Sequence, residues 1–152
     1  MEPVLRVHDA PHPDDVAHVQ SRVHDETVAR AAIGPDRDLA VEARDGDGGE
    51  MLGACYGGTW GGTCELEGLW VRPDQRRNGL GSRLLAEAEF EASRRGCLQV
   101  VLLTHELQAP GFYEQRGYDV VGRVDGYPDG SAALWFHKTL VPDPTGTVRE
   151  SS

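Results

Sequence analysis

The feature that most constrains the fold of this chain is the stretch 68–96, GLWVRPDQRRNGLGSRLLAEAEFEASRRG. Its first residues are strand formers, and Pro73 ends the strand because it has no N–H to give to a sheet ladder. Gly79 and Gly81 then open a predicted helix that ends at Gly96, a typical position for a left-handed C-terminal cap. Backbone N–H groups at such a helix start lack partners and lie at the positive end of the helix dipole. The sequence therefore predicts a binding site for phosphate oxygens there.

Length and composition are typical of one globular domain. The chain has 152 residues, of which 39% are hydrophobic and 26% are charged. We expect a single domain over residues 1–141 and a frayed tail over residues 142–152. The net charge of −10 argues against nucleic acid or an anionic membrane surface as a partner.

The cysteine and histidine patterns do not favour a disulfide framework or a metal site. The three cysteines are odd in number and form no Cys-x-x-Cys pair. The histidines near the N-terminus lack the spacing of a metal site, so no metal is expected. No signal peptide and no apolar run long enough to span a membrane are visible, so a cytoplasmic location is predicted.

Hydrophobic periodicity and turn signals predict the other elements. A short strand is expected at Val4–His8, followed by a helix from Asp14 to Ile33, with an interruption near His24 left open. A loose turn is expected over residues 57–62, where four glycines flank Thr59 and Trp60. Strands are expected over residues 39–43, 51–56, 64–71, 98–103, 118–124 and 132–140, and a short helix over residues 108–116. The unbroken apolar run 98–103 is typical of a central strand buried on both faces.

The glycine turn matches neither of two familiar phosphate-binding motifs. A dinucleotide fingerprint requires a third glycine at position 84, which is Leu84, and the Gly-Lys-Ser/Thr of a phosphate loop is absent. What remains is Arg-x-x-Gly-x-Gly, formed by Arg76, Gly79 and Gly81. This motif resembles the acetyl-CoA loop of the GCN5-related N-acetyltransferase (GNAT) family. The segment 112–118, FYEQRGY, is similar to the Phe-Tyr-x-x-x-Gly-Phe signature of the same family. Within the family, the sequence resembles small bacterial-type members that have a Leu-Trp-Val strand.

The resemblance implies the GNAT acyl-CoA N-acyltransferase fold, of the α+β or α/β class. Such a fold has a mixed, mostly antiparallel sheet of six to seven strands, splayed into a V and flanked by helices. Acetyl-CoA would be the cosubstrate, with its pantetheine arm in the gap of the V and its pyrophosphate on the glycine loop. The implied cofactor-binding residues are Leu69, Trp70, Val71, Arg76, Arg77, Asn78, Gly79, Leu80, Gly81 and Ser82. Glu106 stands where many members have an asparagine that contacts pantetheine, so no cofactor contact is assigned to it.

Acetyl transfer to an amine needs a neutral amine, a polarised carbonyl and a proton for the departing thiolate. Tyr113 matches the tyrosine to which the family often assigns the role of proton donor, although packing on the core would also explain it. Glu65 and Glu67 lie two apart on one strand, so both are expected on one face, as general bases or as solvent-facing residues. His105, just past the central strand, is expected to face the substrate together with Glu106.

The resulting functional prediction is an acetyl-CoA-dependent N-acetyltransferase that works by direct attack. The acceptor is predicted to be a small primary amine, with a peptide N-terminus or a lysine as the next option. An acyl-CoA-binding sensor with little turnover is the alternative from another class, and transfer of a longer acyl group is a third option. Phe90, which falls opposite the apolar face of the main helix, leaves a homodimer open.

Overall fold

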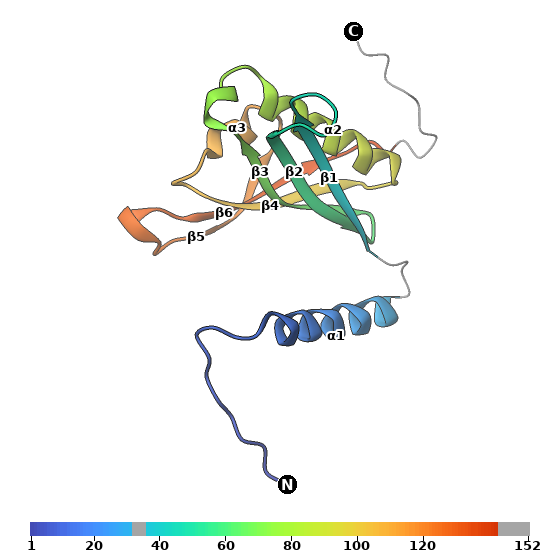
Figure 1. Ribbon diagram of the computed structural model, residues 1–152, viewed down its shortest axis with the longest axis vertical. Helices are drawn as coiled ribbons and strands as arrows, with labels where there is room; N and C mark the ends of the chain where they lie inside the picture. Colours follow the sequence, from blue (N-terminus) through green and yellow to red (C-terminus); the bar gives the residue numbers. More distant parts are fainter. Residues whose placement is uncertain (32–35, 143–152) are drawn as a thin grey trace. The chain divides into compact units, whose positions relative to one another are not determined.

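The computed structural model of the protein describes residues 1–31 and 36–142, which belong to two compact units, Met1–Pro35 and Asp36–Ser152. Each unit is described by itself (Figure 1). The prediction that residues 1–141 form one domain stays a prediction. The predicted tail, from residue 143 onward, lies outside the described residues.

The described part of the N-terminal unit, residues 1–31, contains one helix, α1 (Pro13–Ala31). The helix is continuous through His24, so the interruption left open there does not occur, and the predicted end at Ile33 lies outside the described residues. The strand predicted at Val4–His8 is wrong, because these residues have no regular secondary structure. A strand needs a partner for its backbone N–H and C=O groups. Every described sheet pairing lies within residues 37–139, and the local sequence pattern carries no information about this.

The second unit is built on a six-stranded mixed sheet in the order β1-β2-β3-β4-β6-β5. In the described residues only β3 and β4 pair in parallel, and every other pair is antiparallel, as the resemblance implied. The strands are β1 (Arg37–Arg44), β2 (Met51–Trp60), β3 (Thr63–Val71), β4 (Gln99–His105), β5 (Asp119–Val124) and β6 (Ala133–Thr139). Figure 1 shows β1–β3 fanning away from β4–β6 toward the end of the sheet that carries α3.

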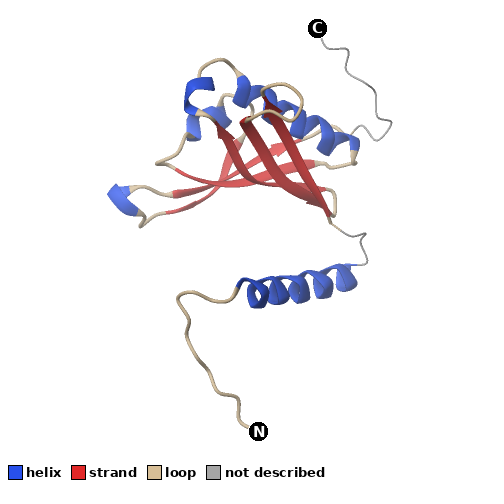
Figure 2. Cartoon of the chain, viewed as in Figure 1, coloured by secondary structure: helices blue, strands red, loops and turns tan. Residues whose placement is uncertain are grey.

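Helix α2 (Leu80–Arg94) connects the parallel strands β3 and β4 and packs on one face of the sheet (Figure 2). The helical spacing predicts an apolar face of Leu80, Leu84, Leu85, Ala88 and Ala92. The last four are buried and join the sheet residues in one core, and Leu80 is partly buried against it. The remaining helices are α3 (Pro110–Glu114) and the single 3₁₀ turns η1 (Pro73–Gln75) and η2 (Pro128–Gly130). None of the described helices is long and apolar enough to cross a lipid bilayer.

The hairpin between β2 and β3 turns later than the sequence suggested. The predicted loose turn began at Gly57, but β2 continues to Trp60, and only Gly61 and Gly62 form the turn. Their φ angles are 55° and 80°, and two-residue hairpins favour glycine because positive φ is required at both positions. Gly57 lies at a register shift instead, where an added Cβ would come within 2.0 Å of the Glu65 carbonyl oxygen. Glycine is therefore needed at position 57 because β3 passes too close for a side chain.

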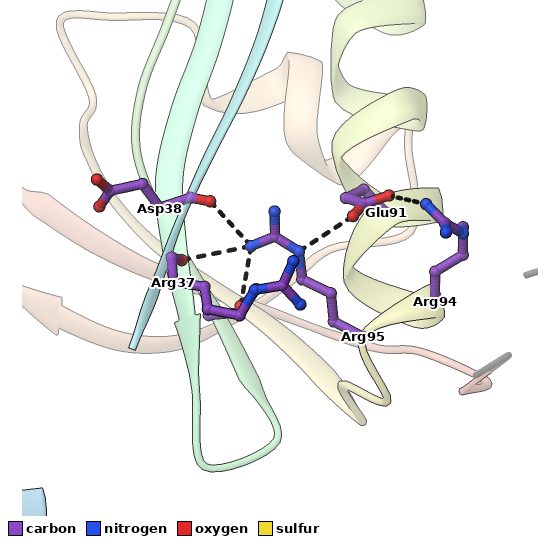
Figure 3. Close-up of polar contacts among 6 residues, drawn as sticks. Arg37, Asp38, Glu91, Arg94 and Arg95 are labelled. Atoms are coloured by element: carbon purple, nitrogen blue, oxygen red, sulfur yellow. Dashed lines mark hydrogen bonds and ion pairs between the residues drawn. The ribbon is translucent and has the colours of Figure 1, made fainter. Parts of the chain in front are cut away.

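Arg95 anchors the C-terminal end of α2 to the start of the sheet (Figure 3). Its Nη1 donates to the backbone carbonyls of Arg37 at 3.3 Å and Asp38 at 3.0 Å, and to Thr59 Oγ1 at 3.1 Å. Its Nε donates to Glu91 Oε1 at 3.1 Å. The side chain is only 13% exposed, so these bonds fix the helix against the edge strand β1 and its neighbour β2.

Candidate active site

A cleft opens where the two parallel strands separate. The β3–β4 ladder runs from Thr63 opposite Gln99 to Leu66 opposite Leu102 and then stops. Beyond that point lies a cavity of about 880 Å³, lined by the second half of β3, the glycine loop, the end of β4 and α3. Since no strand in the described part of the chain pairs with the facing edges of β3 and β4 beyond Leu66 and Leu102, their backbone groups are available to an extended ligand.

The loop between β3 and α2 is held by its own side chains and by unusual backbone angles. Arg76 Nε donates to the Val71 carbonyl at 2.8 Å, so this side chain helps to shape the loop. Gly79 has a φ of +79°, and Arg77, which is not glycine, has a φ of +67°. A left-handed arginine is uncommon and was not predicted. Both arginines and Gly79 line the cleft.

The first turn of α2 leaves backbone donors without helical partners. Gly79 is the N-cap and provides no side-chain cap, and the first helical bond runs from Arg83 N–H to the Gly79 carbonyl at 3.1 Å. The N–H groups of Leu80, Gly81 and Ser82 precede that bond and so have no intrahelical acceptor. All three residues line the cleft. The positive end of the helix dipole adds to these donors, so this turn is suited to an anion.

Nine of the ten predicted cofactor-binding residues line this one cleft; Asn78 does not. The glycines serve different needs. A Cβ at Gly79 would meet open space, so glycine is required there for its positive φ. A Cβ at Gly81 would come 3.4 Å from the Phe112 ring, which is ordinary contact, and a longer side chain would extend beyond it.

Tyr113 reaches the cleft from α3 and is held by other aromatic rings. Its ring centroid lies 5.2 Å from that of Phe112, 5.7 Å from that of Tyr118 and 5.6 Å from that of Phe136. Burial raises the pKa of the Tyr113 phenol above its ordinary value, with a smaller contribution from Cys55. The hydroxyl therefore keeps its proton at neutral pH, as a proton donor must.

The two glutamates of β3 differ in their surroundings. Glu67 lines the cleft, whereas Glu65 does not, and the Glu65 carboxylate accepts a 3.0 Å hydrogen bond from Trp60 Nε1. Both are exposed and alternate with the buried Cys64 and Leu66, as the strand alternation predicts, but the register with β2 shifts at Glu67. Leu66 pairs with Gly57 and Gly68 with Tyr56, so Glu67 is the extra residue of a β-bulge.

His105 and Glu106, which were expected to face the substrate together, separate at the end of β4. His105 lines the cleft, and its ring packs edge-on against Tyr127 at 4.7 Å between centroids. Glu106 is not among the lining residues and forms an ion pair with Arg123. Arg116 also lines the cleft, although no motif or spacing in the sequence predicted this.

The cysteines are placed in the core rather than at the cleft. Cys55, Cys64 and Cys97 are all buried, and burial raises the pKa of Cys55 to about 11 and that of Cys64 to about 12. Thiols in this state are poor nucleophiles at neutral pH. Across the described residues, no cluster of three His, Cys, Asp or Glu side chains could hold a metal ion.

Comparison with known proteins gives a consistent result. Residues 4–118 match the family model described as the acetyltransferase (GNAT) family. The chain is 38% identical over 96 residues to blasticidin-S acetyltransferase of Streptomyces morookaense, a match that covers 62% of this chain and 71% of the relative. A crystal structure from Agrobacterium tumefaciens matches 92% of this chain and 100% of its own at 27% identity, with a TM-score of 0.81. An aminoglycoside 6′-N-acetyltransferase complexed with coenzyme A matches with a TM-score of 0.61 and 26% identity, over 70% of this chain and 75% of the other.

Proposed function

Because this chain belongs to the GNAT acetyltransferase family, we propose that it transfers the acetyl group of acetyl-CoA to a primary amine of a small molecule. The observation that carries the proposal is the first turn of α2, where three backbone N–H groups without helical acceptors line the cleft. Acetyl-CoA has a pyrophosphate that such a turn can bind and an extended amide-bearing arm that can pair with a strand edge.

The residues that would hold acetyl-CoA follow from that fit. The N–H groups of Leu80, Gly81 and Ser82, together with the positive charge of Arg77, would bind the phosphates. Backbone groups of Leu69 and Val71 would pair with the pantetheine amides, since the β3–β4 ladder has already ended at this level. These assignments rest on the backbone N–H donors and on the arginine side chain that line the cleft.

The chemistry proposed for the site is direct transfer. The amine nitrogen attacks the thioester carbonyl, a C–N bond forms, and the C–S bond breaks. Tyr113 would give its phenolic proton to the departing thiolate, and Glu67, directly or through water, would take the proton that the amine loses. The net products are an amide and a thiol, and the phenol regains its proton from solvent, so no covalent enzyme intermediate is needed.

The names of the relatives favour a small-molecule acceptor. One relative is named for blasticidin S and another for aminoglycosides. A carboxylate at Glu67 and a net charge of −10 are compatible with a cationic acceptor.

Thiol release measured with acetyl-CoA and a panel of amines, blasticidin S and aminoglycosides included, tests the proposal. We expect amine-dependent release of CoA together with a mass increase of one acetyl group on the accepted amine. Selective binding of acetyl-CoA with no transfer to any amine would instead favour an acyl-CoA-binding sensor. Absence of both binding and transfer would contradict the proposal.

A further inference from the structure

Arg116 connects the two helices that border the cleft. From the turn that follows α3, its guanidinium Nε donates to Ser82 Oγ in the first turn of α2 at 2.7 Å, and its Nη2 contacts the same oxygen. Its Nη1 donates to the Phe112 carbonyl at 2.7 Å, and its Cζ lies 3.8 Å from the Phe112 ring centroid. The guanidinium is therefore fixed by the carbonyl and the ring of Phe112 and presents its edge to Ser82.

This contact determines what the Ser82 hydroxyl can do. A serine hydroxyl has one hydrogen to donate and two lone pairs to accept with. The Nε and Nη2 groups of Arg116 both donate to the Ser82 oxygen, so the hydroxyl hydrogen must point away from Arg116. Ser82 lines the cleft beside the N–H groups of the same turn, and no described residue accepts a hydrogen bond from its Oγ. A positive group behind the oxygen also makes the hydroxyl a stronger donor.

The surroundings indicate that the Arg116–Ser82 contact is what keeps the hydroxyl in this orientation. Behind the pair lies a second cavity of about 390 Å³, lined by Ser82, Arg116 and residues that include Glu89, Gln115 and Lys138. Of the contacts that the described residues make with the Ser82 hydroxyl, the hydrogen bonds from Arg116 are those that orient it.

We propose that Arg116 is a positioning residue that holds the Ser82 hydroxyl as a donor to the phosphate groups of the acyl-CoA cosubstrate. The inference rests on the proposed function, because it assigns the hydroxyl to the same anion site. Lysine cannot replace arginine in this role, since a single ammonium has neither the planar fork that engages Ser82 nor the flat face that stacks on Phe112.

The test measures acetyl-CoA affinity by calorimetry for Arg116→Lys, Ser82→Ala and the double variant, with melting temperature recorded for each. We expect each single variant to bind about tenfold more weakly, the scale of one hydrogen bond to a charged group. The double variant should bind about as weakly as either single one, because both remove the same interaction. Ser82→Thr keeps the hydroxyl and should bind nearly as well as the wild type. Arg83→Lys, an exposed arginine outside the cleft, is the matched control for charge.

If Arg116 had only a structural role, Arg116→Lys would have a lower melting temperature, and its affinity for acetyl-CoA, measured below that temperature, would be unchanged. Wild-type affinity in Arg116→Lys and Ser82→Ala would overturn the inference while the proposed function stands. Additive losses in the double variant would also overturn it, because Arg116 would then act on the ligand independently of Ser82. If the wild-type protein binds no acetyl-CoA, the proposed function fails and the inference fails with it.

Discussion

The guanidinium Nε of Arg76 donates a 2.8 Å hydrogen bond to the backbone carbonyl of Val71, the last residue of β3. The bond closes the loop that leads to the anion-binding turn, and it fixes the direction in which the chain leaves the sheet. Arg76 and Val71 both line the cleft, so the same contact shapes one wall of the site.

Replacing Arg76 by methionine should weaken acetyl-CoA binding by about tenfold, because the loop loses its closing hydrogen bond and a nearby positive charge. Calorimetric titration measures the change. Arg72→Met is the matched control in the same loop, since Arg72 pairs with Asp74 and Glu50 and does not line the cleft. Equal losses in the two variants would show that the effect is one of net charge alone.

Tyr113→Phe should lower kcat by roughly 10²-fold while acetyl-CoA affinity stays unchanged, because the variant loses only the proton donor. Tyr118→Phe is the control. Its ring neighbours Tyr113, but its hydroxyl is bound to Glu89 at 2.8 Å, and the residue does not line the cleft. The control should lose about 1 kcal/mol of stability and keep kcat. A wild-type kcat in Tyr113→Phe would remove this phenol from the mechanism.

The value of kcat should fall at high pH, because Tyr113 acts as a proton donor only while it is protonated. Burial raises the pKa of Tyr113, so the active, protonated form persists above the ordinary phenol value of 10.0. We expect kcat to hold up to that pH and to fall only as the pH rises through the shifted pKa. Steady-state rates of the wild type across the alkaline range check this. A decline centred well below pH 10 would mean that another group controls the rate.

Glu67→Gln should lower kcat/KM more than Glu65→Gln does, because only Glu67 lines the cleft. The expected loss is about tenfold to a hundredfold, at the low end for a general base that acts on an amine through water. Glu65→Gln keeps an acceptor for Trp60 Nε1 and so serves as the isosteric control. If the order of the two effects were reversed, the carboxylate assigned here would be the wrong one.

Arg95→Met should lower the free energy of unfolding by about 2–4 kcal/mol, because it leaves acceptors of β1, β2 and α2 without their donor. Arg94→Met is its neighbour control. Arg94 forms an ion pair with Glu91 on the surface, with 45% of its side chain exposed, and its loss should cost about 0.5 kcal/mol or less. Urea denaturation of both variants measures the difference. Equal stabilities would show that the network in Figure 3 does not anchor the helix.

The local parts of this fold were predictable from the sequence. The glycine turn, the apolar face of α2 and the existence of the strand β4 all carry their signal in adjacent residues. The prediction that β4 is buried on both faces is wrong, because buried and less buried residues alternate along it and Leu103 is exposed. A helix start with glycine at a positive φ and no side-chain cap follows from the same few positions. The predicted cofactor residues all lie within the continuous stretch 69–82, and most of them line one cleft.

The parts that were wrong or were not predicted depend on partners far along the chain. Val4–His8 has the composition of a strand, but pairing is a property of two segments, and no local pattern reports it. The bulge at Glu67 arises from the register with Tyr56 and Gly57, which alternation along β3 alone does not reveal. Arg116 meets Ser82 across 34 positions of sequence, so its place in the cleft becomes visible only in three dimensions.

The central claim is that the first turn of α2 binds acetyl-CoA, and calorimetric titration of the wild type beside Gly81→Glu and Gly81→Ala tests it most directly. The alanine Cβ would make only ordinary contact with Phe112, so this variant should bind like the wild type, whereas the glutamate brings bulk and negative charge to the anion site. We predict selective binding of acetyl-CoA over NADH and ATP in the wild type. Gly81→Glu should lose that binding at an unchanged melting temperature. Undiminished binding in Gly81→Glu, or no binding in the wild type, would contradict the account.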